Sequence, residues 1–444
     1  MEGSRRPLRC TMTQDILQQV QEKQFDDRPR AESLLLTFIH NTFPALNATN
    51  VELRPQAVSL NSFNGIVTLE DDSRLFFKAH TEADTVIDEY YNATLLEEAG
   101  YPIIKPLHIS RQAGNQLLIY ELIEDPSVFD LAWAIEQGED KSLSKLTAAQ
   151  NHADDALKTY YLRTLAPQTE EDAAAAPIHQ LFYHRLTGGR LERFYGRQTN
   201  NHDEDRSIRL PAGKIPLDKV RGVKWIVNDS QYDQSLDELI TSAIDLLQPA
   251  QPGPSVIGHG DAHNGNVFYR ASDDPPSLLY FDPAFAGRHD PLLDLAKPLF
   301  HNVFAMWMYF PQEKARSTSI EFKRKNGTFE VRHDYEIAPV RHMFLRSKVD
   351  RTLIPILQEL RQRGLLRPDW RRYLKAALFC CPFLTLDLTD TDRFPSEIAL
   401  LGLTMAVEMG AESENERSLI DQTLDDVERV LALDTRPPSD RWYR

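Results

Sequence analysis

The chain of 444 residues is poor in cysteine and in long apolar runs. Two of its three cysteines, Cys380 and Cys381, are neighbours, so there is no disulfide framework and we expect a reducing, cytoplasmic setting. No run approaches the roughly 18 apolar residues of a membrane-spanning helix. The first fifteen residues also lack an apolar segment of signal-peptide length. We therefore expect a protein that is not embedded in a membrane.

Positive charge is also scarce. The chain has 50 Lys and Arg residues against 66 Asp and Glu residues, a formal net charge of −16. This balance argues against non-specific binding to nucleic acid or to anionic membranes. With 41% hydrophobic and 26% charged residues, the composition is that of a globular protein, and the length predicts two or more lobes. The oligomeric state is not encoded in these features.

Two short segments carry most of the polar chemistry. The first reads VIGHGDAHNGNVF over 256–268, and the second reads LYFDP over 279–283. Asp261 could accept a proton from an attacking hydroxyl group, while Asn266 and Asp282 offer oxygen ligands for a Mg²⁺ ion that bridges nucleotide phosphates. This set of residues is typical of a phosphoryl-transfer site.

The apolar runs around these residues predict how they come together. Short strands on either side should hold 261–266 as a loop, and a turn at 273–276 should start the return strand of a hairpin. The return strand would deliver Asp282 beside Asn266. A hairpin thus brings three oxygen-bearing side chains together.

At these residues the sequence resembles the aminoglycoside phosphotransferase family, whose catalytic loop reads H-G-D-x-x-x-x-N. His259, Gly260, Asp261 and Asn266 match that pattern, whereas protein kinases have H-R-D-x-x-x-x-N. The segment DPLLDLA over 290–296 is similar to the family's D-P-x-x-D-L-A, in which the second Asp, here Asp294, braces the catalytic loop. Downstream of Asp282 the next two residues depart from the family's usual metal-binding segment.

The resemblance implies an α+β, protein-kinase-like fold with two lobes. Residues 1–122 would form a small antiparallel-sheet lobe with leading helices, which covers the nucleotide. Residues 123–444 would form a larger, mostly helical lobe with the catalytic loop and the acceptor site. Helical spacing of apolar residues between 14 and 43 predicts the leading helices, and 66–70 with 74–78 reads as a hairpin.

Several nucleotide contacts are expected in the first lobe. The segment 60–65, which includes Ser62, would cover the phosphates although it contains a single glycine. Lys78 ends a strand, and Glu89 falls on the apolar stripe of the helix predicted over 84–99. A carboxylate on a buried stripe needs a cationic partner, so we expect a Lys78–Glu89 ion pair, with Glu97 and Glu98 as alternatives.

The strand over 116–124 would be the hinge between the lobes. The resemblance implies that Glu121 and Ile123 bind adenine through their main-chain groups. The remainder of the chain gives weaker signals. Residues 140–162 and 235–247 look helical, 181–195 reads as an amphipathic helix or a substrate lid, and the last third reads as four helices. Four of its polar residues are candidates for an acceptor pocket, although we expect each to lie on a solvated surface: Arg341, His342, Asp387 and Asp390.

The combined interpretation is an enzyme that moves the γ-phosphoryl group of ATP or GTP to a hydroxyl group of a small molecule with Mg²⁺. A protein kinase is disfavoured because Gly260 replaces an arginine and no D-F-G to A-P-E segment is present. A pseudokinase scaffold is disfavoured because each catalytic position is filled. The H-x-D-x-H spacing of His259, Asp261 and His263 could instead hold zinc or iron in a hydrolase, but Asn266 and Asp282 then have no role.

Overall fold

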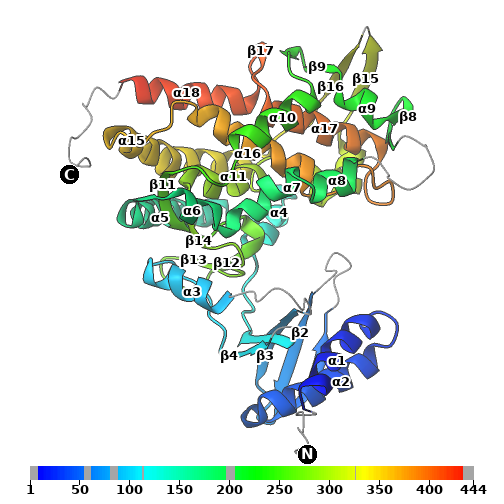
Figure 1. Ribbon diagram of the computed structural model, residues 1–444, viewed down its shortest axis with the longest axis vertical. Coiled ribbons are helices and arrows are strands. Elements are labelled where there is room, and N and C mark those ends of the chain that lie inside the picture. Colours follow the sequence, from blue (N-terminus) through cyan, green and yellow to red (C-terminus); the bar gives the residue numbers. More distant parts are fainter. Residues whose placement is uncertain are drawn as a thin grey trace, which may run out of the picture. The chain divides into compact units, whose positions relative to one another are not determined.

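The computed structural model describes residues 9–54, 62–80, 89–112, 115–196, 206–325 and 327–433 (Figure 1). The chain divides into two compact units. The first unit holds residues 1–94 and 103–125, and the second holds residues 95–102 and 126–444. Among the described residues, no helix has the length and the apolar character needed to cross a membrane.

The first unit is built on a five-stranded antiparallel sheet in the order β1-β2-β3-β5-β4. Figure 1 shows α1 and α2 beside this sheet. The elements are α1 (Arg9–Lys23), α2 (Arg28–Thr42), η1 (Pro44–Leu46), β1 (Ala48–Leu53), β2 (Ser62–Leu69), β3 (Arg74–His80), α3 (Glu89–Glu98), β4 (His108–Gln112) and β5 (Asn115–Glu121). The end of α3, from Leu95 on, belongs to the second unit.

Local sequence explains the β2–β3 hairpin of this sheet. The turn places Asp72 at a φ of 63°, in the left-handed region that Asp tolerates better than most residues. The Asp71 side chain accepts a hydrogen bond from the backbone N–H of Ser73 at 3.0 Å. The predicted hairpin is confirmed.

The core of the first unit lies between the helices and the sheet. On α2, Leu35, Phe38 and Ile39 recur at helical spacing and are all buried. They share one apolar cluster with buried side chains of the strands, among them Phe63 and Phe77. Each such side chain stabilises the fold by about 1.5–3 kcal/mol through burial alone. The predicted leading helices are therefore confirmed, and their role is to cover the sheet.

The second unit combines many helices with small sheets. Its helices are α4 (Val128–Glu136), α5 (Leu143–Thr164), α6 (Glu170–Ala174), η2 (Pro177–Leu181), α7 (Tyr183–Leu186), α8 (Arg190–Tyr195), α9 (Leu217–Arg221), α10 (Leu236–Leu246), η3 (Asn264–Asn266), α11 (Pro291–His301), α12 (Met306–Tyr309), α13 (Pro311–Ser317), α14 (Pro339–Lys348), η4 (Val349–Leu353), α15 (Ile354–Gln362), α16 (Trp370–Leu384), α17 (Ser396–Gly410) and α18 (Leu419–Leu433).

The strands of the second unit form two sheets and two hairpins. A five-stranded sheet has the order β15-β16-β9-β10-β17, a three-stranded sheet has the order β14-β11-β6, and the pairs β12-β13 and β7-β8 are hairpins. The strands are β6 (Ala166–Gln168), β7 (Ser207–Leu210), β8 (Gly213–Pro216), β9 (Lys224–Val227), β10 (Ser230–Tyr232), β11 (Gly253–Gly258), β12 (Val267–Arg270), β13 (Ser277–Tyr280), β14 (Gly287–His289), β15 (Ile320–Lys325), β16 (Thr328–His333) and β17 (Glu414–Asn415).

Helix α11 lies in the interior of the second unit. All of its residues are buried, and it packs against α16 and β11. Asp290 caps its first turn by accepting a hydrogen bond from the Leu292 N–H at 2.8 Å, and Pro291 occupies the first helical position. Two charged side chains, Asp294 and Lys297, lie within this buried helix. Each of them needs a partner, because an unpaired buried charge is costly.

Most predicted helices of the second unit are confirmed. The segments expected over 140–162 and 235–247 correspond to α5 and α10, and the last third of the chain holds α15 to α18. The apolar and aromatic residues of 295–309 predict a single helix, which is wrong, because α11 ends at His301 and α12 begins at Met306. The interpretation of 181–195 as one amphipathic helix is also wrong, since η2, α7 and α8 are short and separate.

The five-stranded sheet of the second unit was not predicted, because this lobe was expected to be mostly helical. Its strands β9 and β16 run parallel although about a hundred residues separate them in the chain, and Trp225 pairs with Phe329 in that register. The two rings are buried at a centroid distance of 5.1 Å. The basic residues of 314–333 predict an exposed segment, but the structure shows that this segment supplies β15 and β16 of the sheet.

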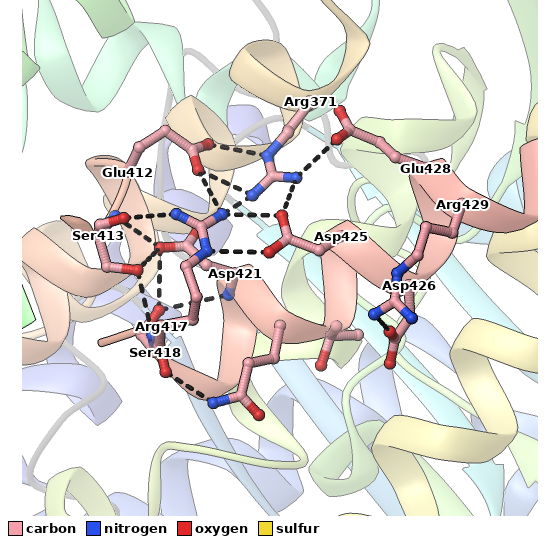
Figure 2. A network of polar contacts seen from close by, with 12 residues as sticks. Arg371, Glu412, Ser413, Arg417, Ser418, Asp421, Asp425, Asp426, Glu428 and Arg429 are labelled. Atoms are coloured by element: carbon pink, nitrogen blue, oxygen red, sulfur yellow. Dashed lines mark hydrogen bonds and ion pairs between the residues drawn. The ribbon is translucent and has the colours of Figure 1, made fainter. Parts of the chain in front are cut away.

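An ion-pair network ties α16 to α18 and to the segment between α17 and α18 (Figure 2). Arg371 on α16 contacts Glu412 at 2.8 Å, Asp425 at 2.8 Å and Glu428 at 3.1 Å. Arg417 also contacts Asp425 at 2.8 Å. Because one guanidinium group bonds three carboxylates, the network fixes three separate segments relative to one another.

Candidate active site

The predicted catalytic loop follows β11 and lies in the second unit. Strand β11 pairs with β14 through Gly258 and Gly287, and the β12–β13 hairpin follows the loop. A Cβ atom on Gly258 would stand 2.6 Å from side-chain atoms of His289 and Asp294, so a larger residue has no room there. The strand end is therefore pressed directly against the N-terminal part of α11.

His259 joins the loop that carries Asp261 to the loop that carries Asp282. Its Nδ1 accepts a hydrogen bond from the Asp261 N–H at 3.4 Å, and its Nε2 lies 2.9 Å from the carbonyl oxygen of Phe281. These partners require the neutral tautomer in which Nε2 carries the proton. His259 is fully buried and thereby holds two functional segments in register.

Asp294 holds the backbone of the same loop. Its Oδ1 accepts hydrogen bonds from the Gly260 N–H at 2.5 Å and from His289 Nε2 at 3.0 Å, and its Oδ2 accepts one from the Tyr161 hydroxyl. Burial raises the pKa of Asp294, but the bonds from His289, Tyr161 and Gly260 outweigh it and lower the pKa to about 2. Asp294 is therefore ionised, and this geometry suits the predicted role of brace.

Only glycine fits at position 260. Its φ is 81°, and a Cβ atom would lie 2.3 Å from the carbonyl oxygen of Phe285. The absence of an arginine at this position thus follows from the path of the backbone.

The Asp261 carboxylate lies beside a lysine that the sequence analysis missed. Lys297 Nζ on α11 is 3.3 Å from Asp261 Oδ1, and His263 Nε2 is 3.9 Å from the same oxygen. Burial raises the pKa of Asp261, but the charge of Lys297, with smaller effects of His263 and Arg185, outweighs it and lowers the pKa below its ordinary value. Asp261 is therefore a carboxylate that can accept a hydrogen bond from a hydroxyl group.

Asn266 and Asp282 lie at the open end of the β12–β13 hairpin. The Phe281 N–H donates to the carbonyl oxygen of Asn266 at 3.1 Å, so the predicted approach of Asp282 to Asn266 is confirmed for the backbone. Asn266 Nδ2 donates to the carbonyl oxygen of Asp261 at 2.9 Å, which orients the amide. Asp282 has a φ of 55°, a conformation that few non-glycine residues adopt outside turns and functional sites.

This donor set fits Mg²⁺ better than zinc or iron. One amide oxygen and one carboxylate are hard ligands that leave positions for phosphate oxygens and water. Both ring nitrogens of His259 already bind backbone groups, so the H-x-D-x-H spacing does not make a metal site. Within the described ranges, no group of three or more His, Cys, Asp or Glu side chains could hold a metal ion.

The predicted nucleotide residues lie in the first unit. Lys78 is half-buried on β3, where it pairs with Asn64 and Leu118, and Glu121 ends β5 with Ile123 two residues beyond. Ser62 begins β2 and Glu89 begins the described part of α3, but their side chains lie outside the described residues. The Lys78–Glu89 ion pair therefore stays a prediction.

The expectation of a solvated surface is wrong for Arg341. This side chain is 1% exposed, and its Nε lies 2.9 Å from Glu136 Oε2. Lys314 contacts the other Glu136 oxygen at 2.6 Å. Arg341 is therefore a structural partner of α4, whereas His342 on the next position is exposed.

Aromatic and imidazole rings extend from the catalytic loop toward α4. The rings of His263 and His301 are 5.6 Å apart, and the Tyr309 hydroxyl lies 2.8 Å from His301 Nδ1. Phe129 on α4 meets the Tyr309 ring edge-on at 5.0 Å. Burial and the charge of Lys297 keep the pKa of His301 well below its usual value, so this ring is neutral. The rings give the site a largely uncharged side.

One family model covers this site. It is described as the phosphotransferase enzyme family and matches residues 66–318. The chain belongs to the phosphotransferase enzyme family. Membership makes it a small-molecule phosphotransferase, and the α+β, protein-kinase-like fold predicted from the sequence is confirmed.

Solved structures with a similar fold were compared with this phosphotransferase. A thermostable mutant of aminoglycoside phosphotransferase APH(4)-Ia, in complex with AMP-PNP and hygromycin B, is 13% identical, with 85% of this chain and 98% of that chain covered and a TM-score of 0.43. A Plasmodium vivax ethanolamine kinase is 11% identical, with 98% and 96% covered and a TM-score of 0.42. At these values neither likeness carries an argument about the acceptor. No curated protein matches this chain.

Proposed function

We propose that this phosphotransferase moves the γ-phosphoryl group of ATP to a hydroxyl group of a small molecule in a Mg²⁺-dependent reaction. The observation that carries the proposal is the ionised carboxylate of Asp261, which lies 3.3 Å from the buried Lys297. Asp261 is on a loop that His259 and Asp294 hold in place. GTP is the alternative donor.

Asp261 would orient the acceptor hydroxyl. The hydroxyl oxygen forms a bond to the γ-phosphorus, the bond from that phosphorus to the β–γ bridging oxygen breaks, and ADP leaves. The hydroxyl proton passes to the Asp261 carboxylate. Lys297, beside that carboxylate, would stabilise negative charge on the transferred group.

Other residues would bind the donor. Asn266 and Asp282 would hold Mg²⁺, which when bound neutralises charge on the β- and γ-phosphates. In the first unit, Lys78 fixed by Glu89 would contact the phosphates and Ser62 would belong to the loop that covers them. Glu121 and Ile123 would bind adenine through main-chain groups.

The proposal also covers setting and partners. Nucleotide and a small hydroxylated acceptor are the expected partners, and the charge of −16 disfavours nucleic acid. A reducing cytoplasm suits a chain whose neighbouring Cys380 and Cys381 are free and buried. Burial raises the pKa of both thiols, so they are unreactive.

The test is turnover by the full chain with Mg²⁺ and ATP or GTP against a panel of sugars, amino alcohols, hydroxy acids and nucleosides. We expect acceptor-dependent release of ADP, and a decrease of about a thousandfold in kcat for Asp261→Asn. Asp218→Asn, which changes an exposed carboxylate on α9, is the matched control and should keep full activity. If no acceptor is turned over and no nucleotide raises the melting temperature, the proposal is wrong.

A further inference from the structure

Positive charge exceeds negative charge around the Asp261 carboxylate. Lys297 lies 3.3 Å from it, and Arg185 on α7 interacts electrostatically with both Asp261 and Lys297. Arg190 and Arg193 on α8 interact in turn with Arg185. Three cationic side chains, Lys297, Arg185 and Arg190, therefore share the field of one carboxylate.

Helices α7 and α8 are anchored at this place by the end of α16. Arg190 Nη1 donates to the carbonyl oxygens of Leu384 at 3.1 Å and Thr385 at 2.5 Å. The Tyr195 hydroxyl donates to the carbonyl oxygen of Phe383 at 3.0 Å, and the two rings stack at 4.4 Å. The cationic side chains are thus carried by a packed part of the fold.

The same end of α16 lies against α11. Cys381 Sγ is 4.0 Å from the carbonyl oxygen of Ala296, the residue before Lys297. Helix α16 therefore brings the arginines of α7 and α8 and the lysine of α11 to one region, although more than a hundred residues separate them in the chain.

Apart from Asp261, these cations have no carboxylate partner among the described residues. In the ranges that the structure describes, the Arg185 side chain makes no hydrogen bond or ion pair, and the Lys297 side chain pairs with Asp261 alone. Arg190 binds neutral carbonyl groups. Asp387 is engaged elsewhere, since its Oδ1 accepts bonds from the N–H and the hydroxyl of Thr389. A partly buried guanidinium group without a counterion favours an anionic ligand.

We infer that Arg185, supported by Arg190, binds a carboxylate or phosphate group of the acceptor, so that the acceptor is a hydroxylated anion. This inference rests on the proposed function and narrows it to a substrate class. The carboxylate or phosphate would form charge-assisted hydrogen bonds with the guanidinium group, while the hydroxyl of the same molecule meets Asp261.

The γ-phosphate of the nucleotide offers the same anionic oxygens. Lys297 is well placed to bind the γ-phosphate, because it lies directly beside the Asp261 carboxylate, which accepts the proton of the acceptor hydroxyl. Arg185 comes from a different helix and has no partner there. Kinetics must therefore separate an effect on the acceptor from an effect on the nucleotide.

The experiment uses the full chain with Mg²⁺·ATP and acceptors matched in size that differ in charge. Glycerate, gluconate and glycerol phosphate represent the anions, glycerol and glucose the neutral molecules, and ethanolamine and kanamycin the cations. We expect the highest kcat/KM for an anion. Arg185→Gln should raise the KM of that anion by about tenfold or more, because a hydrogen bond between two charged groups is lost. The KM of ATP should change by less than about twofold.

Two further variants serve as controls. Arg185→Lys keeps the charge and should recover part of the lost affinity, which a merely structural role of Arg185 would not predict. Arg209→Gln removes an exposed arginine on β7 and should leave both KM values unchanged.

The outcomes separate the inference from the proposed function. Turnover with a preference for neutral or cationic acceptors contradicts the inference and leaves the proposed function standing. A raised KM for ATP in Arg185→Gln, with an unchanged acceptor KM, assigns Arg185 to the nucleotide and also contradicts it. If no acceptor is turned over, calorimetric titration of the three anions into protein loaded with Mg²⁺·AMP-PNP decides. Binding that Arg185→Gln abolishes supports the inference, and no binding overturns it.

Discussion

The second unit holds two groups of arginine and lysine residues that are neutralised in opposite ways. In the network of Figure 2, Arg371 alone forms ion pairs with four carboxylates. Around Asp261, three cations share one carboxylate. Burial lowers the pKa of Arg371, but the bonds to Glu412 and Asp425 outweigh it and raise that pKa above its usual value. Burial lowers the pKa of Arg185, and the charge of Asp261 offsets this only in part.

This difference distinguishes a group of charges that stabilises the fold from a group that is suited to binding a ligand. A paired charge meets its counterion when the chain folds, so its effect is seen in the stability of the protein. A cation without a protein counterion gains little from folding and much from an anionic ligand. The comparison therefore predicts that substitutions in the first group change stability and that substitutions in the second group change kinetics.

The largest change in stability is expected for Asp421→Ala in the network. Asp421 is fully buried and forms an ion pair with Lys375, whose side chain is 2% exposed. Removal of Asp421 leaves this buried lysine with Glu412, 3.9 Å away, as its remaining carboxylate partner among the described residues, which should lower the free energy of unfolding by about 3–5 kcal/mol. Urea unfolding followed by circular dichroism measures the change. Asp426→Ala, which breaks the exposed pair with Arg429 in the same helix, should cost less than about 1 kcal/mol.

Equal losses of stability in these two variants would contradict the distinction between buried and exposed pairs. The kcat of Asp421→Ala, measured well below its melting temperature, should stay close to that of the unchanged protein, because the network does not touch Asp261.

The next largest effect is kinetic and concerns Lys297→Met. We expect kcat to fall by about a hundredfold or more, comparable to the loss of one charged group at an oxyanion site. Because Lys297 lowers the pKa of Asp261, its removal raises that pKa. Asp261 must be ionised to act, so the acid limb of the kcat/KM profile should move to higher pH. An unchanged acid limb would show that Lys297 does not control the charge of Asp261.

The smallest of these effects concerns Asp294, a carboxylate that is neutralised mainly by hydrogen bonds. Its pKa of about 2 lies below the value in an unfolded chain, so its contribution is complete above about pH 4 and is lost as the pH falls through about 2. The contribution is about 2 kcal/mol by linkage. Urea unfolding at a series of acid pH values should show this loss, and Asp294→Asn should flatten the curve. A curve with the same slope in both proteins would contradict this assignment.

Sequence patterns of short range predicted their structures well. The β2–β3 hairpin, the loop after β11 and the approach of residue 282 to Asn266 each depend on residues within about 25 positions of one another. Turn residues and alternating apolar residues specify such structures locally. The role of Asp294 came from a family resemblance, and the structure supplied its three hydrogen-bond donors.

Contacts of long range could not be predicted in this way. Arg341 is buried because Glu136 meets it from about two hundred residues away, and β9 pairs with β16 across a hundred. Lys297 had a local signal that was overlooked. It lies three residues after Asp294 in an otherwise apolar helix, and a charge in such a helix needs a partner. The residue that stands 3.3 Å from Asp261 could therefore have been found from the segment PLLDLAK.

The burial of helix α11 means that the charges of the site are oriented before the reaction begins. Asp294 and Lys297 stand one turn apart on a helix that is buried along its whole length, so neither can shift far without the helix itself moving. The dipoles and charges that face the reacting atoms are thus oriented when the chain folds, and little reorganisation is left for each catalytic cycle. Variants that loosen the packing of α11 should slow the chemical step even when each side chain of the site is retained.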